Sequence, residues 1–568
     1  MQRTGDIATV CREHLFTEKI IITAHAGGGR QLRERCMLDG TPWLNLHALS
    51  VEGLARRILG ERHPYCRGRL TEGEALRMLG EICATELDPT SRYAPMRGNR
   101  GFHRALLHEF EECRLAALDP AALPLRHFGD AAKAKDVRRL AAAFAGSCRR
   151  RGQATRAELI TEALRTAGER MSPEGMSCER ILLVESGVLA LLPAVERRLL
   201  EESGDIVVLA PADDTLRQLH FRRAQRVEWE IRAAFRAAAA GTGWEDAEIV
   251  LLREDMLPLV YELSRQLDIP STFDPGVPLH YSKAARTVTA YLRWISTDFH
   301  TAHLVRMMYD GVPDFSQWKS SGVRGGRLSC AAMLRETAIG RGRERCLLRV
   351  DARIRELEER VASADTDDGT EKQLHEYRAN RAWIARLLET TPATDGQGCL
   401  SLHAVAEGLR VLVTEMSRDK FPGEQQALEE MAALFEEYRR GVDLRADPAA
   451  IAGIINEDIH GITFPLVLQE PGTEPLRVTT PQPGHLHISL ATRGGYSGRE
   501  RTFILGAGAE TLPRSTAQNP VLLDDERRSI NDAAESDLPL AEEQPSRSVR
   551  AFEGLLGRLR GEVYLSWT

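Results

Sequence analysis

The chain has 568 residues and a mass of 63.2 kDa, which is too long for one ordinary hydrophobic core and predicts several domains. With 43% hydrophobic and 28% charged residues, its composition is that of a globular protein and excludes wholesale disorder. The formal net charge of −7 excludes a field that attracts nucleic acid over the whole surface, so any such binding must come from local patches.

The N-terminal segment MQRTGDIATVCREH lacks the apolar region of a signal peptide, and no apolar run is long enough to span a bilayer. None of the ten cysteines falls in a C-x-x-C pair, so the sequence offers no zinc ribbon and no local redox motif. Reduced, buried thiols are typical of intracellular proteins. We therefore expect a cytoplasmic protein with no membrane partner, no metal and no cofactor of its own.

The first half of the chain alternates strands and helices around a helical segment. The apolar run at 19–24 predicts a buried parallel strand, and a glycine turn that opens a helix follows it. A short strand and a helix are expected within 42–59, and helical periodicity extends from 70 to 175. Runs at 179–186 and 204–214 predict two more buried strands, which together indicate a doubly wound α/β sheet with a helical insertion.

The second half repeats this order of elements. A helix at 228–241 and a strand at 246–255 precede a long helical region, and two strands are expected near 485–491 and 501–506. Strands this late complete a second sheet that begins near residue 248. The sequence therefore predicts an α/β protein with two cores, each interrupted by helices. The expected segments are 1–65 with 175–215 for the first core, 66–174 for its insertion, 216–290 with 476–568 for the second core, and 291–475 for its insertion.

The late segment carries an ordered set of short motifs. They are Ser489–Thr492 at a strand end, Gly498–Glu500, Phe503–Gly506, Glu510, Pro513 and Asp525–Arg528. With the two-core layout, this order resembles superfamily-1 DNA helicases of the UvrD type, in which a G-L-E loop, a strand, a G…E…P turn and an EERR helix follow one another. Segments 101–118 and 519–531 make the chain similar to the AddB/RexB branch, the helicase-like subunits of bacterial ATP-dependent exonucleases that process double-strand breaks.

This resemblance covers nearly the whole chain and has several implications. It implies two RecA-like parallel-sheet cores, each with a helical insertion. It implies as partners DNA, as ends or single strands, and an AddA-like helicase–nuclease subunit that carries Mg-ATP. Family members usually continue into a PD-(D/E)XK nuclease with an iron–sulfur cluster. No lysine here has Asp or Glu two positions before it, and the chain stops at EVYLSWT, so we expect that nuclease domain to be missing.

Residues 24–31 stand where such a helicase has its phosphate loop, G-x-x-x-x-G-K-[ST], and read Ala-His-Ala-Gly-Gly-Gly-Arg-Gln. We interpret Gly27, Gly28, Gly29, Arg30 and Gln31 as a vestigial nucleotide site, because the lysine and the hydroxyl that hold phosphate and magnesium are absent. A plain helix-entry turn is the alternative reading of the three glycines.

Two further parts of the nucleotide site are also reduced. Where the family has a D-E pair after the strand, this chain has Glu185 and Ser186, so one carboxylate remains. Shortly after the acidic–arginine helix the family has an arginine finger in a T-R-A string, whereas this chain has Asp532-Ala533-Ala534. Because the phosphate loop, the carboxylate pair and the arginine finger all lack the expected residues, we expect no productive hydrolysis of ATP.

Three basic stretches are candidate nucleic-acid contacts, because arginine neutralises phosphate and aromatic rings stack on bases. The alternative for each stretch is a solvated helix end. We favour the stretch with Tyr93 and Phe102, whose rings show no amphipathic period that would bury them. The candidates are Arg92, Tyr93, Arg97, Arg100, Phe102 and Arg104 in the first stretch, Arg149, Arg150 and Arg151 in the second, and Arg324 and Arg327 in the third.

The leading hypothesis is a catalytically inactive, helicase-like subunit that binds DNA and acts as a scaffold in an AddAB-like double-strand-break repair complex. One alternative is an active nucleotide-dependent DNA helicase with an atypical phosphate loop, in which Arg30 and Glu185 do the work. Another is a protein–protein adaptor that does not touch DNA. Seven of the 75 basic residues are lysine, which leaves arginine as the main contact for any anion.

Overall fold

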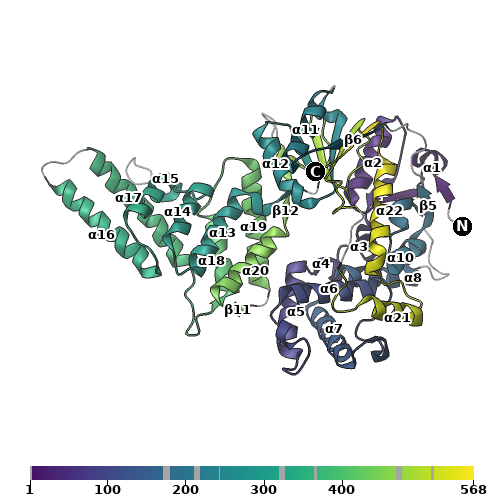
Figure 1. Ribbon diagram of the computed structural model, residues 1–568, viewed down its shortest axis with the longest axis horizontal. Helices are drawn as coiled ribbons and strands as arrows, with labels where there is room; N and C mark the ends of the chain where they lie inside the picture. Colours follow the sequence, from purple (N-terminus) through teal and green to yellow (C-terminus); the bar gives the residue numbers. More distant parts are fainter. Residues whose placement is uncertain are drawn as a thin grey trace. The chain divides into compact units, whose positions relative to one another are not determined.

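The computed structural model describes residues 3–170, 180–209, 218–241, 243–274, 276–318, 326–363, 368–441, 443–468, 476–512 and 517–568 (Figure 1). The chain forms two compact units, Met1–Asp274 with Thr479–Thr568 and Pro275–Val478. Two sheets, of five and six strands, contain parallel pairs throughout, which confirms the expected α/β class. Among the helices of the described residues, none combines the length and the apolar character that crossing a bilayer requires.

The first sheet has the strand order β1-β5-β4-β2-β3. Its strands are β1 (Arg3–Gly5), β2 (Glu18–Ile22), β3 (Leu46–Leu49), β4 (Arg180–Glu185) and β5 (Asp205–Leu209). Ile20 and Leu182 face one hydrophobic cluster, and Ile21 and Leu183 face another. Because side chains alternate between the two faces of a strand, a continuous apolar run such as 20–22 needs cover on both faces. The helices that supply it are α1 (Ile7–Glu13), α2 (Ala26–Leu38), α3 (Val51–Leu59) and α10 (Ala194–Ser203).

The second sheet has the order β6-β17-β16-β7-β15-β8. Its strands are β6 (Gln218–Arg223), β7 (Ala247–Leu251), β8 (Ser271–Asp274), β15 (Leu486–Leu490), β16 (Arg501–Leu505) and β17 (Glu562–Trp567). The late strands β15 and β16 both pair with β7, as the sequence predicts. The helices that accompany this sheet are α11 (Val227–Ala239), α12 (Leu257–Gln266) and α22 (Gln544–Arg558).

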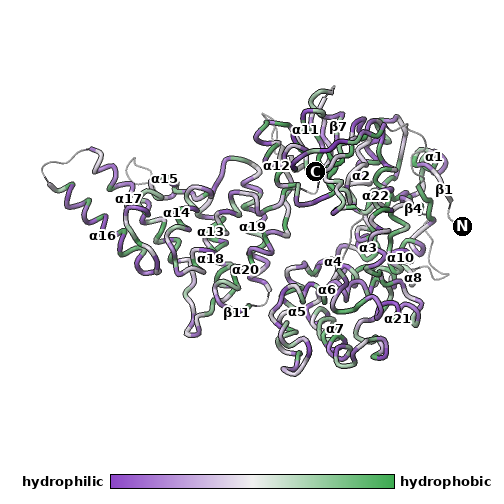
Figure 2. Tube along the Cα trace, in the orientation of Figure 1, coloured by the Kyte–Doolittle hydropathy of each residue, from purple (hydrophilic) through white to green (hydrophobic). Residues whose placement is uncertain are grey.

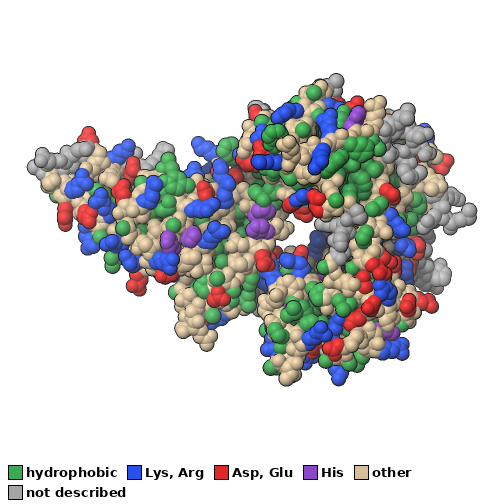
Figure 3. All heavy atoms as spheres, viewed as in Figure 1, with side chains coloured by type: hydrophobic (Ala, Val, Ile, Leu, Met, Phe, Trp, Pro, Cys, Tyr) green, Lys and Arg blue, Asp and Glu red, His purple; other side chains and the backbone are tan. Residues whose placement is uncertain are grey.

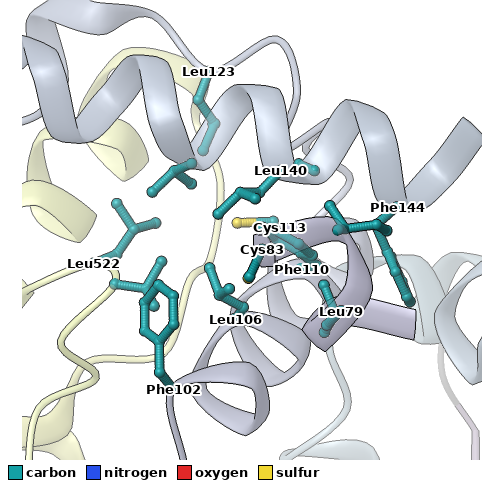
Figure 4. Close-up of a cluster of buried hydrophobic side chains, with 14 of the residues drawn as sticks. Leu79, Cys83, Phe102, Leu106, Phe110, Cys113, Leu123, Leu140, Phe144 and Leu522 are labelled. Carbon is teal, nitrogen blue, oxygen red and sulfur yellow. The ribbon is translucent and has the colours of Figure 1, made fainter. Parts of the chain in front are cut away.

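Three helices between β3 and β4 enclose a core of their own, which Figure 4 shows: α5 (Glu72–Glu86), α6 (Arg100–Leu115) and α7 (Ala131–Arg151). Two neighbouring helices, α4 (Pro64–Arg67) and α8 (Arg156–Arg170), pack instead against the core of the first sheet. Leu522 and Ile530 from the C-terminal part of the chain lie in the core of α5, α6 and α7. This core therefore includes α21 (Asp524–Ala534), which carries the acidic–arginine motif.

Buried ion pairs hold α21 in this place. Arg527 donates to Glu109 at 2.6 Å and to Glu112 at 2.7 Å, and Lys133 pairs with Glu526 at 2.5 Å. Burial raises the pKa of Glu109 to about 7, although the positive charge of Arg527 acts against the rise. Charges this deeply buried require partners, because an unpaired one costs several kcal/mol. The motif thus joins α21 to the first helical segment rather than to the second sheet.

The unit Pro275–Val478 is largely helical. Its helices are α13 (Lys283–Ser296), α14 (Thr301–Asp310), α15 (Arg327–Glu336), α16 (Arg343–Ala362), α17 (Asp368–Thr390), α18 (Leu402–Thr414), α19 (Pro422–Arg440) and α20 (Pro448–His460). Figure 2 shows hydrophilic and hydrophobic residues alternating along these helices. Their apolar sides enclose Trp294 and Trp383, both fully buried. Short antiparallel pairs join β9 (Val277–Pro278) to β12 (Thr463–Phe464), β10 (Leu400–Ser401) to β11 (Arg445–Ala446), and β13 (Leu466–Leu468) to β14 (Leu476–Val478).

Candidate functional site: the glycine-rich turn and the residues that cover it

The glycine-rich turn follows β2 at the carboxyl edge of the first sheet. Helix α2 begins at Ala26 with His25 as its N-cap, so Gly27, Gly28 and Gly29 form the first helical turn and are all buried. A turn of this kind can bind an anion only if its N–H groups are accessible from outside. What packs against the three glycines therefore decides what this turn can do.

Side chains occupy the space next to each glycine. A Cβ atom at Gly28 would lie 2.7 Å from the ring of Tyr496, and one at Gly29 would lie 2.9 Å from Ala48. A Cβ atom at Gly27 would lie 2.8 Å from the ring of His25. The absence of side chains at these positions thus lets other side chains approach the helix backbone. The ring of Tyr496, 1% exposed, covers the turn.

Arg30 and Gln31, which we interpret from the sequence as part of a vestigial nucleotide site, differ in their exposure to solvent. Arg30 is exposed on the second half of the turn. Gln31 is 2% exposed, and neither atom of its amide has a hydrogen-bond partner among the described residues. A buried amide without a partner costs about 1–3 kcal/mol. The two side chains therefore lie in different environments, one in solvent and one in the protein interior.

Glu185, the remaining carboxylate, lies at the end of β4 and is fully engaged. Its Oε2 accepts a hydrogen bond of 2.6 Å from the hydroxyl of Tyr496, and its Oε1 accepts one of 2.5 Å from Nε of Arg558. The guanidinium of Arg558 also lies 4.5 Å from the centroid of the Tyr496 ring. Burial, followed by the charge of Glu185, raises the pKa of Tyr496 well above its usual value, so this hydroxyl stays protonated and donates.

The arginine at this site is one that the sequence analysis missed. Asp532–Ala534, where an arginine was sought, are exposed at the end of α21. Arg558 lies instead at the end of α22, shortly before the last strand β17. The available signal was the string Gly557-Arg558-Leu559-Arg560 directly before that strand, since a residue there lies close to the second sheet.

The loop between β15 and β16, which carries Tyr496, is tightly held. Glu248, 1% exposed, accepts hydrogen bonds from Ser489 at 2.8 Å, from the backbone of Gly495 at 3.1 Å, and from Ser497. Arg499 donates to four backbone carbonyls, and burial lowers its pKa. A buried carboxylate with several donors fixes the path of the backbone around it. The ring of Tyr496 is therefore part of a rigid loop.

A second set of contacts links the same two sheets. Nε2 of His25 lies 3.0 Å from the carbonyl oxygen of Arg493, and the guanidinium of Arg493 lies 3.3 Å from Asp274 at the end of β8. Burial lowers the pKa of His25, so the neutral ring is favoured. Together with the Tyr496–Glu185–Arg558 cluster, these contacts join the carboxyl edge of the first sheet to that of the second.

The expected exposure of the two aromatic rings in segment 91–104 is wrong. Tyr93 is 6% exposed and Phe102 is 4% exposed, with ring centroids 4.8 Å apart in the first helical core. The period was present in the sequence, because Phe102, Leu106 and Phe110 recur every four residues and face the same side of α6. Rings buried in this way cannot stack on bases.

The arginines of this segment are largely engaged. Arg92 lies 3.6 Å from Asp130, Arg104 donates to Glu72 at 3.0 Å, and Arg97 donates to the carbonyl of Leu87. Arg100 begins α6 and is half-buried. Figure 3 shows basic and acidic side chains side by side over much of the visible face. Exposed ion pairs of this kind contribute little to stability, but they reduce the local positive charge.

The arginines of the other two basic stretches differ in whether they are exposed or bound to another residue. Arg149 and Arg150 are exposed at the end of α7 and form no ion pair with a described residue, while Arg151 lies 3.6 Å from Glu81. Arg327 donates to the carbonyl of Gly311 at 2.5 Å within the second unit. Arg324 and Pro513 lie outside the described residues. Arg149 and Arg150 are thus the candidates that keep an accessible charge.

No group of three His, Cys, Asp or Glu side chains that could hold a metal ion is found among the described ranges. His487, on β15, is fully buried and its Nδ1 lies 2.9 Å from the hydroxyl of Thr272, whereas Nδ1 of His485 donates to the carbonyl of Pro483 at 2.8 Å. A scan against protein-family models finds no match to this chain, and a search of curated proteins finds none either.

Proposed function

We propose that this chain is a helicase-like subunit that binds neither ATP nor magnesium and serves as a scaffold, with DNA and an AddA-like helicase–nuclease subunit as its partners. The observation that carries the proposal is the contact between Tyr496 and Gly28, because the ring packs against the glycine turn and the N–H of Gly28 already donates to the carbonyl of His25 at 3.2 Å. The two parallel sheets are then the two RecA-like cores of a UvrD-type fold.

The arrangement around Glu185 supports this reading. In a nucleotide site between two cores, an acidic residue after a strand of the first core and an arginine from the second face the same phosphate groups. Here Glu185 of the first sheet and Arg558 of the second contact each other directly. The charges that would hold magnesium and a phosphate neutralise one another, and the cluster becomes a connection between the two sheets.

The active-helicase alternative requires Arg30 and Glu185 to act on one nucleotide. Glu185 has both oxygens in hydrogen bonds, and Arg30 is exposed to solvent. We therefore expect no ATP hydrolysis by the full chain, with or without single-stranded DNA, in a steady-state assay. Turnover that disappears in Arg30→Ala would overturn the proposal.

The burial of Tyr93 and Phe102 favours a second candidate function, that of an adaptor between proteins that does not contact DNA. Fluorescence anisotropy with a labelled single-stranded oligonucleotide at several salt concentrations separates the two. If the scaffold binds DNA, Arg149→Gln with Arg150→Gln lowers the affinity and the salt slope, since each phosphate contact releases counterions. No binding at low salt, together with capture of a helicase–nuclease subunit, supports the adaptor.

Phe102→Ala provides a check on the same experiment. Removing this ring from the core costs about 3–5 kcal/mol of stability, as for other buried aromatic residues. Since the ring does not reach the surface, we expect the affinity for DNA to stay unchanged at temperatures where the variant is folded. Thermal unfolding and anisotropy measured on the same sample distinguish a loss of stability from a loss of binding.

A further inference from the structure

A cavity of about 940 Å³ lies beside the glycine-rich turn, at the carboxyl edges of both sheets. Ala24 after β2 and Gly187 after β4 line it from the first sheet, and Leu252 after β7 and Ala491 after β15 line it from the second. One face of α22 forms the remaining side. All of these residues belong to the unit that contains both sheets.

This position is the one at which open parallel sheets bind ligands. In each sheet, the chain leaves one central strand toward opposite sides, and ligands bind outside the carboxyl ends at such a switch point. Strand β2 has β3 on one side and β4 on the other, and β7 has β15 on one side and β16 on the other. The cavity lies at both switch points, whereas Gly27–Gln31 do not line it.

The lining combines an apolar floor with a small number of charged groups. Val188, Leu192 and Leu555 are buried and form part of the floor. Three of the lining arginines are already paired, Arg253 with Asp255 at 2.6 Å and with Glu510 at 3.4 Å, Arg156 with Glu196, and Arg558 with Glu185. The pairs of Arg156 and Arg558 are neutral, whereas Arg253 faces two carboxylates, so cations for a ligand must come from the side chains that remain.

The remaining arginines are Arg547 and Arg550 on α22. Neither forms an ion pair with a residue that the structure describes, and Arg550 is exposed at the cavity. Glu254 is the lining acid without an ion pair among the described residues. Counted with Glu185, the partner of Arg558, the lining has no positive excess as a whole, but Arg547 and Arg550 present two cations without an ion partner among the described residues next to an apolar floor. A volume of this size is within the range of cavities that bury small organic ligands.

We propose that this cavity binds an organic anion, with an apolar or aromatic body against the floor and a carboxylate or sulfonate at Arg547 and Arg550. The site goes beyond the proposed function, because it does not use the covered glycine turn. Arginine is suited to the acid group, since its planar fork donates two parallel hydrogen bonds to such groups. The apolar body supplies affinity by burial, and the acid group supplies selectivity.

Two fluorescent probes of similar shape test the two halves of this proposal on the full chain. The first is 8-anilinonaphthalene-1-sulfonate, which carries the acid group, and the second is N-phenyl-1-naphthylamine, which lacks it. We expect saturable binding of both. Arg547→Gln with Arg550→Gln weakens the sulfonate by about tenfold and leaves the uncharged probe within about twofold, since only the sulfonate makes charged hydrogen bonds.

Ala551→Trp and Ser548→Trp place an indole in the cavity from α22, and each is expected to weaken both probes by at least about tenfold. Arg345→Gln with Arg349→Gln on α16 is the matched control, because it removes the same charge from exposed positions of the other unit. This control leaves both probes unchanged. Circular dichroism verifies that the variants are folded.

Several outcomes overturn the proposal. The first is no saturable binding of the sulfonate to the wild type. The second is an equal loss in the α22 and α16 double variants, which reflects net charge alone. The third is unchanged binding of both probes in the two tryptophan variants, which places the probes elsewhere. If single-stranded DNA displaces the sulfonate, the cavity belongs to a DNA path instead.

Discussion

The glycine-rich turn and the cavity beside it lie at the same edge of the two sheets but differ in what covers them. The turn contains the glycine motif of the sequence, yet Tyr496 packs against it. Arg558 forms an ion pair with Glu185, the nearby carboxylate at the end of β4. The cavity is marked by no sequence motif, yet it is open and has two arginines that form no ion pair with any described residue. Access and free charge, rather than glycine content, thus distinguish a site that can bind from one that cannot.

The same helix takes part in both regions. The end of α22 contributes Arg558 to the closed cluster, and its earlier turns contribute Arg547 and Arg550 to the cavity. Gly554 on α22 lies directly against Gly187, since a Cβ at Gly187 would be 3.7 Å from the Cα of Gly554. This close approach places the arginines of one helix in two very different environments.

The largest expected effect comes from comparing Arg558→Ala with Arg547→Ala. The Arg558 and Glu185 side chains are both 14% exposed, so removing the arginine leaves a largely buried carboxylate without its charge partner. We expect a loss of about 2–4 kcal/mol for Arg558→Ala, below the range for fully buried pairs because some solvent remains. Arg547→Ala should change stability by less than about 0.5 kcal/mol. Urea unfolding of both variants gives the comparison, and equal losses would show that the cluster is not closed.

A smaller effect is expected for Gly28→Ala. Alanine favours a helix over glycine by about 1 kcal/mol, but its Cβ would lie 2.7 Å from the buried Tyr496 ring, and such overpacking costs about 1–3 kcal/mol. We expect a net loss of stability for Gly28→Ala. In the Tyr496→Ala background, where the ring is absent, the same substitution should cost less. Gly53→Ala in α3 is the control, because its Cβ would meet only ordinary contacts at 3.5 Å, and it should stabilise. If the two alanines behave alike in thermal unfolding, the ring does not pack on the turn.

Lowering the pH should destabilise the folded chain over a defined pH range, because His487 is buried as a neutral ring. Burial lowers the pKa of His487 to about 3, so the folded chain keeps this ring neutral while the unfolded chain takes up a proton near pH 6.5. Stability is therefore lost as the pH falls below 6.5, by about 1.4 kcal/mol for each pH unit until the folded chain also protonates. His487→Gln should flatten this loss between pH 7 and pH 5.5. His485→Gln, one residue before β15 and half-buried, is the matched control for the loss of a histidine in the pH profile of thermal unfolding.

The sequence predicts the sheets well where strands are buried on both faces. The apolar runs at 20–22 and 182–184 have this property, and so do the two late strands that pair with β7. Strand β6 was missed because it lies at the edge of its sheet, where Leu219 and Phe221 are exposed and no apolar run forms. Strand β6 is recognised only by its pairing with β17, which lies more than 300 residues later in the chain.

The candidate site is less predictable for a similar reason. The absence of the lysine, the hydroxyl and the second carboxylate can be read directly from residues 24–31 and 185–186. The covering ring cannot, because Tyr496 meets Glu185 across 311 residues and no local pattern marks the contact. Likewise, the charges of Glu526 and Arg527 suggest an exposed helix, although partners about 400 residues away allow them to be buried.

The most direct test of the closed turn is equilibrium binding of ATP, measured by isothermal titration calorimetry on the full chain with magnesium present. We expect no heat of binding at millimolar nucleotide for the wild type, because Tyr496 occupies the space in front of Gly28 and Arg558 engages Glu185. Saturable binding of ATP to the wild type, abolished by Arg30→Ala and unaffected by Tyr496→Phe, would contradict this account.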